Sequence, residues 1–188
     1  MIIKNTYFTS YFPLISIIFF SMSFAINVQI RVVDFLRDFG IYEGMLEFFT
    51  DGGIKLTIFF LLVLIFFMVI AALKLIADTM VQLSLLFFSK DAEGYTLNKI
   101  RVGSWIYLLA SVVAMVTFKV IIVPLALFLL ASLIYFIFFI YRVSDHLSVV
   151  NQIGLVCFHL FFWSGFLFTV AFAVLKLYNS FVKSLPII

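Results

Sequence analysis

Long apolar stretches, separated by short polar ones, follow one another along the chain and predict five membrane-spanning helices. We place these spans at residues 11–30, 54–76, 102–118, 122–142 and 153–175. About 20 predominantly apolar residues are needed for a helix to cross the hydrocarbon of a bilayer. The chain is therefore expected to be all-α, a polytopic membrane helical bundle that forms one integral membrane domain over residues 1–188.

Proline and charge mark where two of these helices begin. The uncharged runs 102–118 and 120–141 are separated by a lysine, and as a single helix they would measure about 60 Å, twice the hydrocarbon thickness. Pro124 suits the first turn of a new helix, so two antiparallel spans are expected here, and Pro13 suits the start of the first span. The first span also resembles a cleavable signal peptide with a cleavage site at residues 23–25, but its apolar run continues beyond that site.

Between the first two spans, residues 31–53 combine charged and apolar positions at helical spacing. Glu43, Glu47 and Asp51 recur every four residues opposite apolar positions, and residues 31–39 show a similar division into two faces. Both halves predict short amphipathic helices that lie in the membrane interface with their apolar faces towards lipid. Their acidic faces suit the outer leaflet or a protein partner. The alternative is a solvated face that only keeps a loop at the membrane surface.

Composition excludes a water-soluble globular protein. Hydrophobic residues make up 66% of the chain and charged residues 11%, and the mean hydropathy is +1.29. Soluble domains are about half apolar and a quarter charged. The formal net charge of +3 is small and dispersed, so nucleic acid is not expected as a partner. The single cysteine, Cys157, allows no internal disulfide.

The sequence contains no motif of a known catalytic centre. HExxH, GxSxG, P-loop and dinucleotide-binding patterns are absent. His146, Cys157 and His159 do not have the spacing of a zinc ligand set. We therefore expect no enzymatic activity, no cofactor and no metal ion, and we expect the lipid bilayer as the surrounding partner.

Lys74, Asp78 and Gln82 form a polar stripe at four-residue spacing along the second apolar stretch. Ionisable residues deep in a bilayer are costly and typical of a working site such as a proton or ion relay. A helix that enters the bilayer at Lys55, however, has risen about 28 Å by Lys74, which is nearly the hydrocarbon thickness. This count favours the edge of the membrane, where a lysine reaches the headgroups. The helix is then expected to continue to Phe88 along or beyond the interface.

Two further features lie in the fifth span. His159 either titrates or binds a ligand or, as is more common for a histidine in an apolar helix, forms a hydrogen bond to a neighbouring helix. Gly165, Thr169 and Ala173 recur every four residues, and such small-residue faces let helices approach closely. They predict packing against another membrane protein or self-association.

Basic residues are divided almost evenly between the two sides of the membrane and give only a weak preference for orientation. Lys90, Lys99 and Arg101 cluster in one short loop. Cytoplasmic loops are enriched in lysine and arginine. We therefore expect a cytoplasmic N-terminus in a cell-membrane protein.

Three strings carry a resemblance to a known family: LKLIADTMVQLSLLFFSKDAEG, the following KIRVGSW, and LKLYNSFVKSLP near the C-terminus. With these strings the chain resembles the YufK-like family of small bacterial integral membrane proteins. The similarity spans the chain and is most specific from Leu73 to Trp105. It implies a bacterial inner-membrane setting and no catalytic residues, because the family has no established activity to carry over.

Two functions from different classes fit the sequence. The first is a non-enzymatic membrane component that binds or regulates a partner through its small-residue faces and its acidic segment. The second is a small transporter or channel subunit with Lys74, Asp78 and Gln82 on its pathway. The second function needs the charged pair to point into the bundle and to meet polar groups from other spans. Those groups are few, which favours the first function; they are chiefly Asn27, Gln29, Ser111, Thr117, His159 and Thr169.

Overall fold

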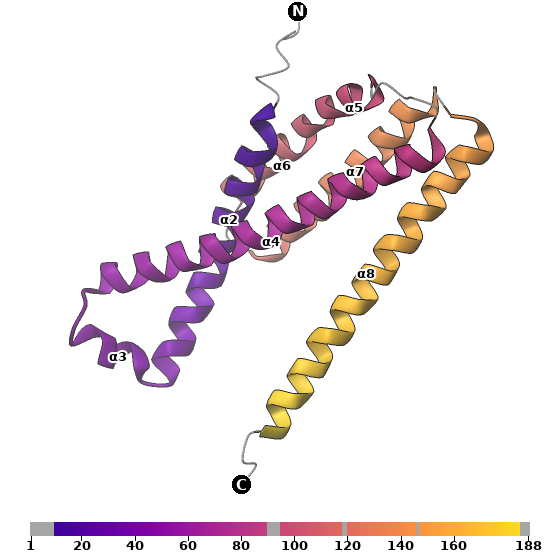
Figure 1. Ribbon diagram of the computed structural model, residues 1–188. Coiled ribbons are helices and arrows are strands. Elements are labelled where there is room, and N and C mark those ends of the chain that lie inside the picture. Colours follow the sequence, from indigo (N-terminus) through magenta and orange to yellow (C-terminus); the bar gives the residue numbers. More distant parts are fainter. Residues whose placement is uncertain (1–9, 90–94, 118–119, 146, 185–188) are drawn as a thin grey trace, which may run out of the picture.

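The computed structural model describes residues 10–89, 95–117, 120–145 and 147–184, and its architecture is built from helices (Figure 1). In chain order these elements are α2 (Phe12–Asp38), α3 (Ile41–Leu46), α4 (Asp51–Phe88), α5 (Tyr95–Ile100), the 3-10 helix η1 (Arg101–Gly103), α6 (Ser104–Val116), α7 (Ile122–Ser144) and α8 (Val149–Ser184). Helices α2, α4, α7 and α8 are long and apolar enough to cross a membrane, and the segment Arg101–Val116 is apolar but shorter. The predicted all-α membrane helical bundle is confirmed.

Several helix ends follow local signals in the sequence. Pro13 lies in the first turn of α2 and Pro124 in the first turn of α7. The hydroxyl of Thr50 caps α4 by accepting a hydrogen bond from the Gly53 N–H at 3.2 Å. α6 and α7 are separate helices that pack antiparallel, as expected, although residue 118 at the predicted end of the third span lies outside the described residues.

Two helices are much longer than a single bilayer crossing requires. α4 has 38 residues and α8 has 36. At a rise of 1.5 Å per residue these helices measure about 57 Å and 54 Å, against about 30 Å of hydrocarbon. Both helices therefore extend beyond the predicted ranges 54–76 and 153–175. A helix of this length fits a bilayer only if it is tilted or if one of its ends leaves the lipid.

Residues 31–38 continue α2 and do not form the separate interfacial helix that their two faces suggested. No glycine or proline lies between Pro13 and Gly40, so no residue in that stretch breaks the helix earlier. Gly40 follows the helix with a left-handed backbone, φ +68°. A residue with a Cβ adopts this conformation only at a cost. The chain turns at Gly40 into the short helix α3.

Helix α3 packs against the ends of α2 and α4, a contact that the sequence did not predict. Tyr42 is 1% exposed and clusters with Val33 of α2 and Ile54 of α4. The Tyr42 hydroxyl donates a hydrogen bond to Asp51 Oδ1 at 2.7 Å. The ends of α2 and α4 therefore cover Tyr42, whereas Ile41, Phe48 and Phe49 of the apolar face that was expected to meet lipid remain exposed.

The middle of the bundle is built from small and apolar residues of α2, α4, α6 and α7. Phe20, Ile70 and Ala114 form a buried cluster. Phe128 of α7 closes it with an edge-on contact to Phe20, with ring centres 5.3 Å apart. The Ser23 hydroxyl donates to the Ala114 carbonyl oxygen at 2.8 Å. Small side chains at this crossing let the backbones of α2 and α6 approach closely.

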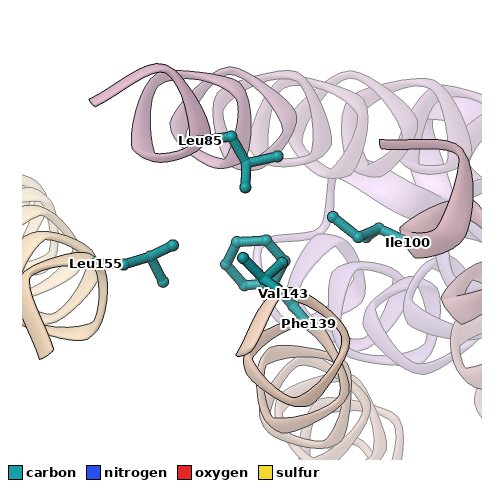
Figure 2. Close-up of a cluster of buried hydrophobic side chains, with 5 residues drawn as sticks. All are labelled: Leu85, Ile100, Phe139, Val143 and Leu155. Atoms are coloured by element: carbon teal, nitrogen blue, oxygen red, sulfur yellow. The ribbon is translucent and has the colours of Figure 1, made fainter. Parts of the chain in front are cut away.

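A second buried cluster joins α8 to the rest of the molecule. Figure 2 shows its side chains converging from four helices: Leu85 of α4, Ile100 of α5, Phe139 and Val143 of α7, and Leu155 of α8. Beside it, the Asn151 side chain donates to the Phe88 carbonyl oxygen at 2.9 Å, which satisfies an acceptor at the end of α4. Gly154 lies so close to Phe88 that a Cβ would come within 2.6 Å of its ring. We call these contacts the α4–α8 junction.

Beyond this junction, α8 leaves the bundle. All residues from 164 to 183 are exposed except Phe166 and Val182, which are partly exposed. Figure 1 shows the yellow end of α8 diverging from α4. The hydrogen bond and ring contacts that we find between α8 and its neighbours α4 and α7, among the described residues, come before residue 160. We call residues 164–183 the distal half of α8.

Candidate functional site

Lys74 and Asp78 form an ion pair along α4, in which the lysine Nζ donates to Asp78 Oδ1 one turn further on. Their side chains are 33% and 45% exposed, so both are partly covered by protein. The predicted continuation of the helix to Phe88 is confirmed. Its last turns pack against α7 and α8 through Leu85. The position of the pair at the edge of the membrane stays a prediction.

The pair lies between two buried apolar clusters on the inner side of α4. Ile70, 7% exposed, precedes the pair, and Leu85, 9% exposed, follows it. A step of four residues rotates a side chain by about 40° around a helix with 3.6 residues per turn. Relative to Ile70, Lys74 is therefore turned by about 40°, Asp78 by about 80° and Gln82 by about 120°. Gln82 is accordingly exposed, which separates it from the pair that it was predicted to extend.

Hydroxyl groups from two other helices lie near the pair. Tyr107 of α6 and Tyr135 of α7 have ring centres 5.5 Å apart, and both phenols are within electrostatic range of the Asp78 carboxylate. The Tyr107 hydroxyl donates to Ser132 Oγ at 3.1 Å, and the Ser132 hydroxyl donates to the Phe128 carbonyl oxygen at 2.8 Å. We call this group the polar cluster: Lys74, Asp78, Tyr107, Ser132 and Tyr135.

Sequence reasoning did not find the three hydroxyls of the polar cluster. Two of the polar residues that it named instead satisfy backbone carbonyls, because Asn27 donates to Ser23 at 2.9 Å and Gln29 donates to Lys55 at 2.8 Å. Tyrosine is enriched at membrane interfaces. Tyr135 instead lies well inside an apolar span, and this unusual position was the signal in the sequence that could have revealed the polar cluster.

The polar cluster offers a carboxylate, an ammonium group and three hydroxyls. Groups of this kind hold and exchange protons and mark ion or proton pathways when they face the interior of a membrane bundle. Within the ranges that the structure describes, no group of three His, Cys, Asp or Glu side chains is placed to hold a metal ion.

His159 belongs to the α4–α8 junction. It is 3% exposed, and its Nδ1 lies 3.0 Å from the Leu155 carbonyl oxygen. Its ring centre is 5.4 Å from those of Phe136 and Phe139 and 5.8 Å from that of Phe158. Its Nε2 is buried without a hydrogen-bond partner among the described residues. The predicted bond to a neighbouring helix is replaced by one within α8, because the facing surface of α7 is aromatic.

Gly165, Thr169 and Ala173 lie on the distal half of α8, and all three are exposed. A Cβ at Gly165 would meet no atom within 4 Å. The Thr169 hydroxyl donates to the Gly165 carbonyl oxygen at 2.8 Å. Lys176 and Lys183 share this face, because seven residues make almost two full turns of a helix. One exposed face of α8 thus carries small residues first and two lysines further along.

An acidic surface lies at the opposite end of α4 from the junction. We call residues 31–55 the acidic corner; they contain five acids and three bases, which gives a net charge of −2. A hydrogen bond from the Lys55 ammonium at 2.7 Å, and then one from the Tyr42 hydroxyl, hold the pKa of Asp51 below its usual value. The hydrogen bond to Asp51, together with burial, raises the pKa of Tyr42. The other four acids are exposed: Asp34, Asp38, Glu43 and Glu47.

Comparison with known proteins relates these features to a family. Residues 29–186 match a family of unknown function (DUF5366), a range that includes the acidic corner, the polar cluster and α8. The chain belongs to this family. It is similar to a protein of Bacillus subtilis (strain 168) described as "Uncharacterized membrane protein YufK", with 44% identity over 184 residues that cover 98% of this chain and 100% of that protein. No solved structure matches the chain.

The 44% identity to this protein, together with membership of DUF5366, confirms the predicted resemblance to the YufK-like family. Together with the apolar helices it establishes this DUF5366 member as a membrane protein with transmembrane helices. The family description carries no activity. The geometry of the polar cluster, the acidic corner and the distal half of α8 therefore has to support any functional proposal.

Proposed function

We propose that this DUF5366 member is a non-enzymatic membrane component that binds a partner protein through the distal half of α8. One observation carries the proposal: residues 164–183 are exposed almost throughout, on a helix that the α4–α8 junction holds by its first turns. A helix of a folded bundle usually buries a stripe along its length. Within the described residues, α8 buries such a stripe over its first turns.

The residues of the distal half favour protein over lipid as the covering surface. Association of helices within a bilayer depends on close packing, which small side chains permit. Gly165, Thr169 and Ala173 provide such a surface, and the open space at Gly165 leaves room for a neighbouring backbone. The acidic corner supports the same proposal, because helices that bind lipid surfaces usually carry basic polar faces.

A role without catalysis is supported by the sparse polar chemistry. The polar cluster combines one ion pair with three hydroxyls. A membrane enzyme needs an acid or base, a nucleophile or activated water and a substrate cradle arranged together. The polar cluster supplies an acid–base group, but its Tyr107 and Ser132 hydroxyls donate to Ser132 Oγ and to the Phe128 carbonyl oxygen, and neither donates to a general base.

The proposed location is the bacterial cell membrane, with a cytoplasmic N-terminus. The bacterial source and membrane description of the similar protein support the location. Lys99 and Arg101, exposed before α6, support the orientation together with Lys90, which lies outside the described residues. Reporter domains fused before α2 and after α8 would test the orientation, because each reporter works on one side of the membrane.

Partner binding can be tested with a photo-crosslinking amino acid at position 169. Thr169 is exposed in the middle of the proposed surface. Leu133 on α7 is also exposed, at 58%, but lies outside that surface, so it serves as the matched control. We expect a specific protein adduct from position 169 and none from position 133. Identical adduct patterns at both positions, or no adduct at either, would contradict the proposal.

A small transporter or channel is a second candidate function, favoured by the polar cluster. The Lys74–Asp78 pair lies between two apolar clusters and near the phenols of Tyr107 and Tyr135, as a pathway requires. Purified protein in liposomes with an imposed pH gradient would test this function. We expect proton flux in the wild type and a large loss of flux in Asp78→Asn, with Gln82→Ala as the exposed control. Equal proton flux in empty liposomes would refute the transporter or channel function. Unchanged membrane insertion of Asp78→Asn is the control that this variant folds.

A further inference from the structure

Two oppositely charged surfaces lie on the same side of the membrane. α4 leads from the acidic corner to the α4–α8 junction, and α8 leads from that junction back across the bilayer. Because both helices are long enough to cross, the end of α8 emerges on the side of the acidic corner. Figure 1 shows both α3 and the end of α8 in its lower part, away from the junction.

The charges of the two surfaces are equal and opposite. The acidic corner has a net charge of −2 from five acids and three bases, and residues 149–183 contain Lys176 and Lys183 with no acid, which gives +2. Within the corner, Lys55 is already paired with Asp51 at 2.7 Å, and the Arg37 guanidinium lies 4.8 Å from the Tyr42 ring centre. The exposed acids of α2 and α3 therefore remain as the surface that attracts a base.

Both lysines lie on the same face of α8 as the small residues. Relative to Gly165, position 169 is turned by about 40° around the helix, 176 by about 20° and 183 by about 0°. A partner that packs against Gly165 and Thr169 in the bilayer therefore continues along the same face to the lysines. This single face is exposed over its whole length.

Among the described residues, the ion pairs Lys55–Asp51 and Lys74–Asp78 do not join the two surfaces within one chain. α8 is held at the junction and diverges from α4 towards its C-terminal end (Figure 1). In a symmetric pair of chains, each surface meets its complement on the other copy, so the contact between the α8 lysines and the acidic corner forms twice. A single self-complementary arrangement then covers the distal half of α8 and neutralises the acidic corner.

We infer that a second copy of this chain packs against the distal half of α8, so that Lys176 and Lys183 of each copy lie against the acidic corner of the other. This inference rests on the proposed function, because it names the partner that the same surface of α8 binds. The small residues provide close packing inside the bilayer, and the charged groups select the partner and its orientation at the membrane surface.

A charge exchange between two differently tagged copies tests the inference. One copy carries Lys176→Glu with Lys183→Glu, and the other carries Glu43→Lys with Glu47→Lys. Each variant paired with itself places like charges together, so we expect co-purification from membranes to fall about tenfold, since several weak surface pairs change from attraction to repulsion. Mixing the two variants places opposite charges together at both contacts, so we expect recovery of the wild-type level.

Recovery in the mixed pair also shows that both variants fold. Arg101→Glu with Arg142→Glu, at exposed positions on the opposite side of the membrane, is the matched control and should leave co-purification unchanged. Variants that self-associate like the wild type, or a mixed pair that stays weak, would overturn the inference.

Crosslinking from position 169 separates failure of this inference from failure of the proposed function. An adduct with twice the mass of the chain supports the second copy as partner. An adduct with a different protein alone overturns the inference and leaves partner binding through α8 standing. The absence of any adduct would count against both.

Discussion

Replacement of Gly154 by alanine is expected to destabilise the α4–α8 junction. An added Cβ would lie 2.6 Å from Phe88 Cε1 and 3.1 Å from Phe88 Cδ1. The Phe88 ring contacts Phe158, with ring centres 6.3 Å apart, and packs against the buried cluster around Leu85. The partly buried ring therefore has to leave its contacts with Phe158 and the Leu85 cluster, or α8 has to shift away from α4.

The size of the effect follows from two opposing terms. Forcing an extra methyl group into packed surroundings costs about 1–3 kcal/mol. Alanine favours a helix over glycine by about 1 kcal/mol. Gly165→Ala makes the same substitution in the same helix where the Cβ meets open space, so it keeps the second term without the first. Gly154→Ala should therefore be about 1–3 kcal/mol less stable than Gly165→Ala.

Unfolding of the purified protein in mixed micelles with increasing SDS measures this difference. Helix content is followed by circular dichroism, and the fluorescence of Trp163, with Trp105→Phe in every variant, reports on α8. Phe88→Leu in the Gly154→Ala background should recover part of the loss, because a smaller side chain relieves the contact. Equal stabilities of the two alanine variants would refute the close approach of α8 to Phe88.

Three further variants test the other contacts. Tyr42→Phe should destabilise the protein at neutral pH, because the hydrogen bond to Asp51 is lost. The pKa of Asp51 is lowered from 3.8, so the contribution of its carboxylate to stability is present above pH 3.8 and is lost as the pH falls further. The pKa of Tyr42 is raised from 10.0, so the contribution of its hydroxyl to stability is lost as the pH rises beyond 10.0. The gap between wild type and Tyr42→Phe in a pH series of SDS unfolding should therefore close at both extremes, and a constant gap would contradict the hydrogen bond. Lys74→Met and Asp78→Leu should each lower the free energy of unfolding by about 1 kcal/mol, because each leaves one unpaired charge beside apolar clusters. The double variant should lose less than the sum of the two. Additive losses would argue against the ion pair. Ala114→Leu should cost about 1–3 kcal/mol in the same assay, since its site between α2 and α6 is fully buried.

Much of the helical framework could be read from the sequence. Pro13 and Pro124 lie in the first turns of α2 and α7, where the sequence placed them, and the break between α6 and α7 follows from a run too long for one crossing. The extension of α4 past Lys74 was also anticipated. These features are local, because each residue inside a bilayer must satisfy its backbone groups within its own helix.

The inward faces of the helices were much harder to predict. In a soluble helix, polar residues mark the outer face, but here the outer face is also apolar. The stripe from Lys74 to Gln82 looked continuous, yet its rotation of about 120° relative to Ile70 turns Gln82 outwards. The burial of Tyr42 against α2 and α4 was missed because a single glycine, Gly40, redirects the chain after α2.

The sequence by itself determined that this protein is an all-α membrane protein, where several of its helices begin, and which family it resembles. Those properties follow from apolar run length, proline placement and local hydrogen bonding. Tertiary structure decided that Tyr107 and Tyr135 lie near Asp78, that α3 packs between α2 and α4, and that α8 leaves the bundle after its first turns. These outcomes depend on how helices with apolar surfaces on every side pack against each other, and steric fit between distant residues settles that packing.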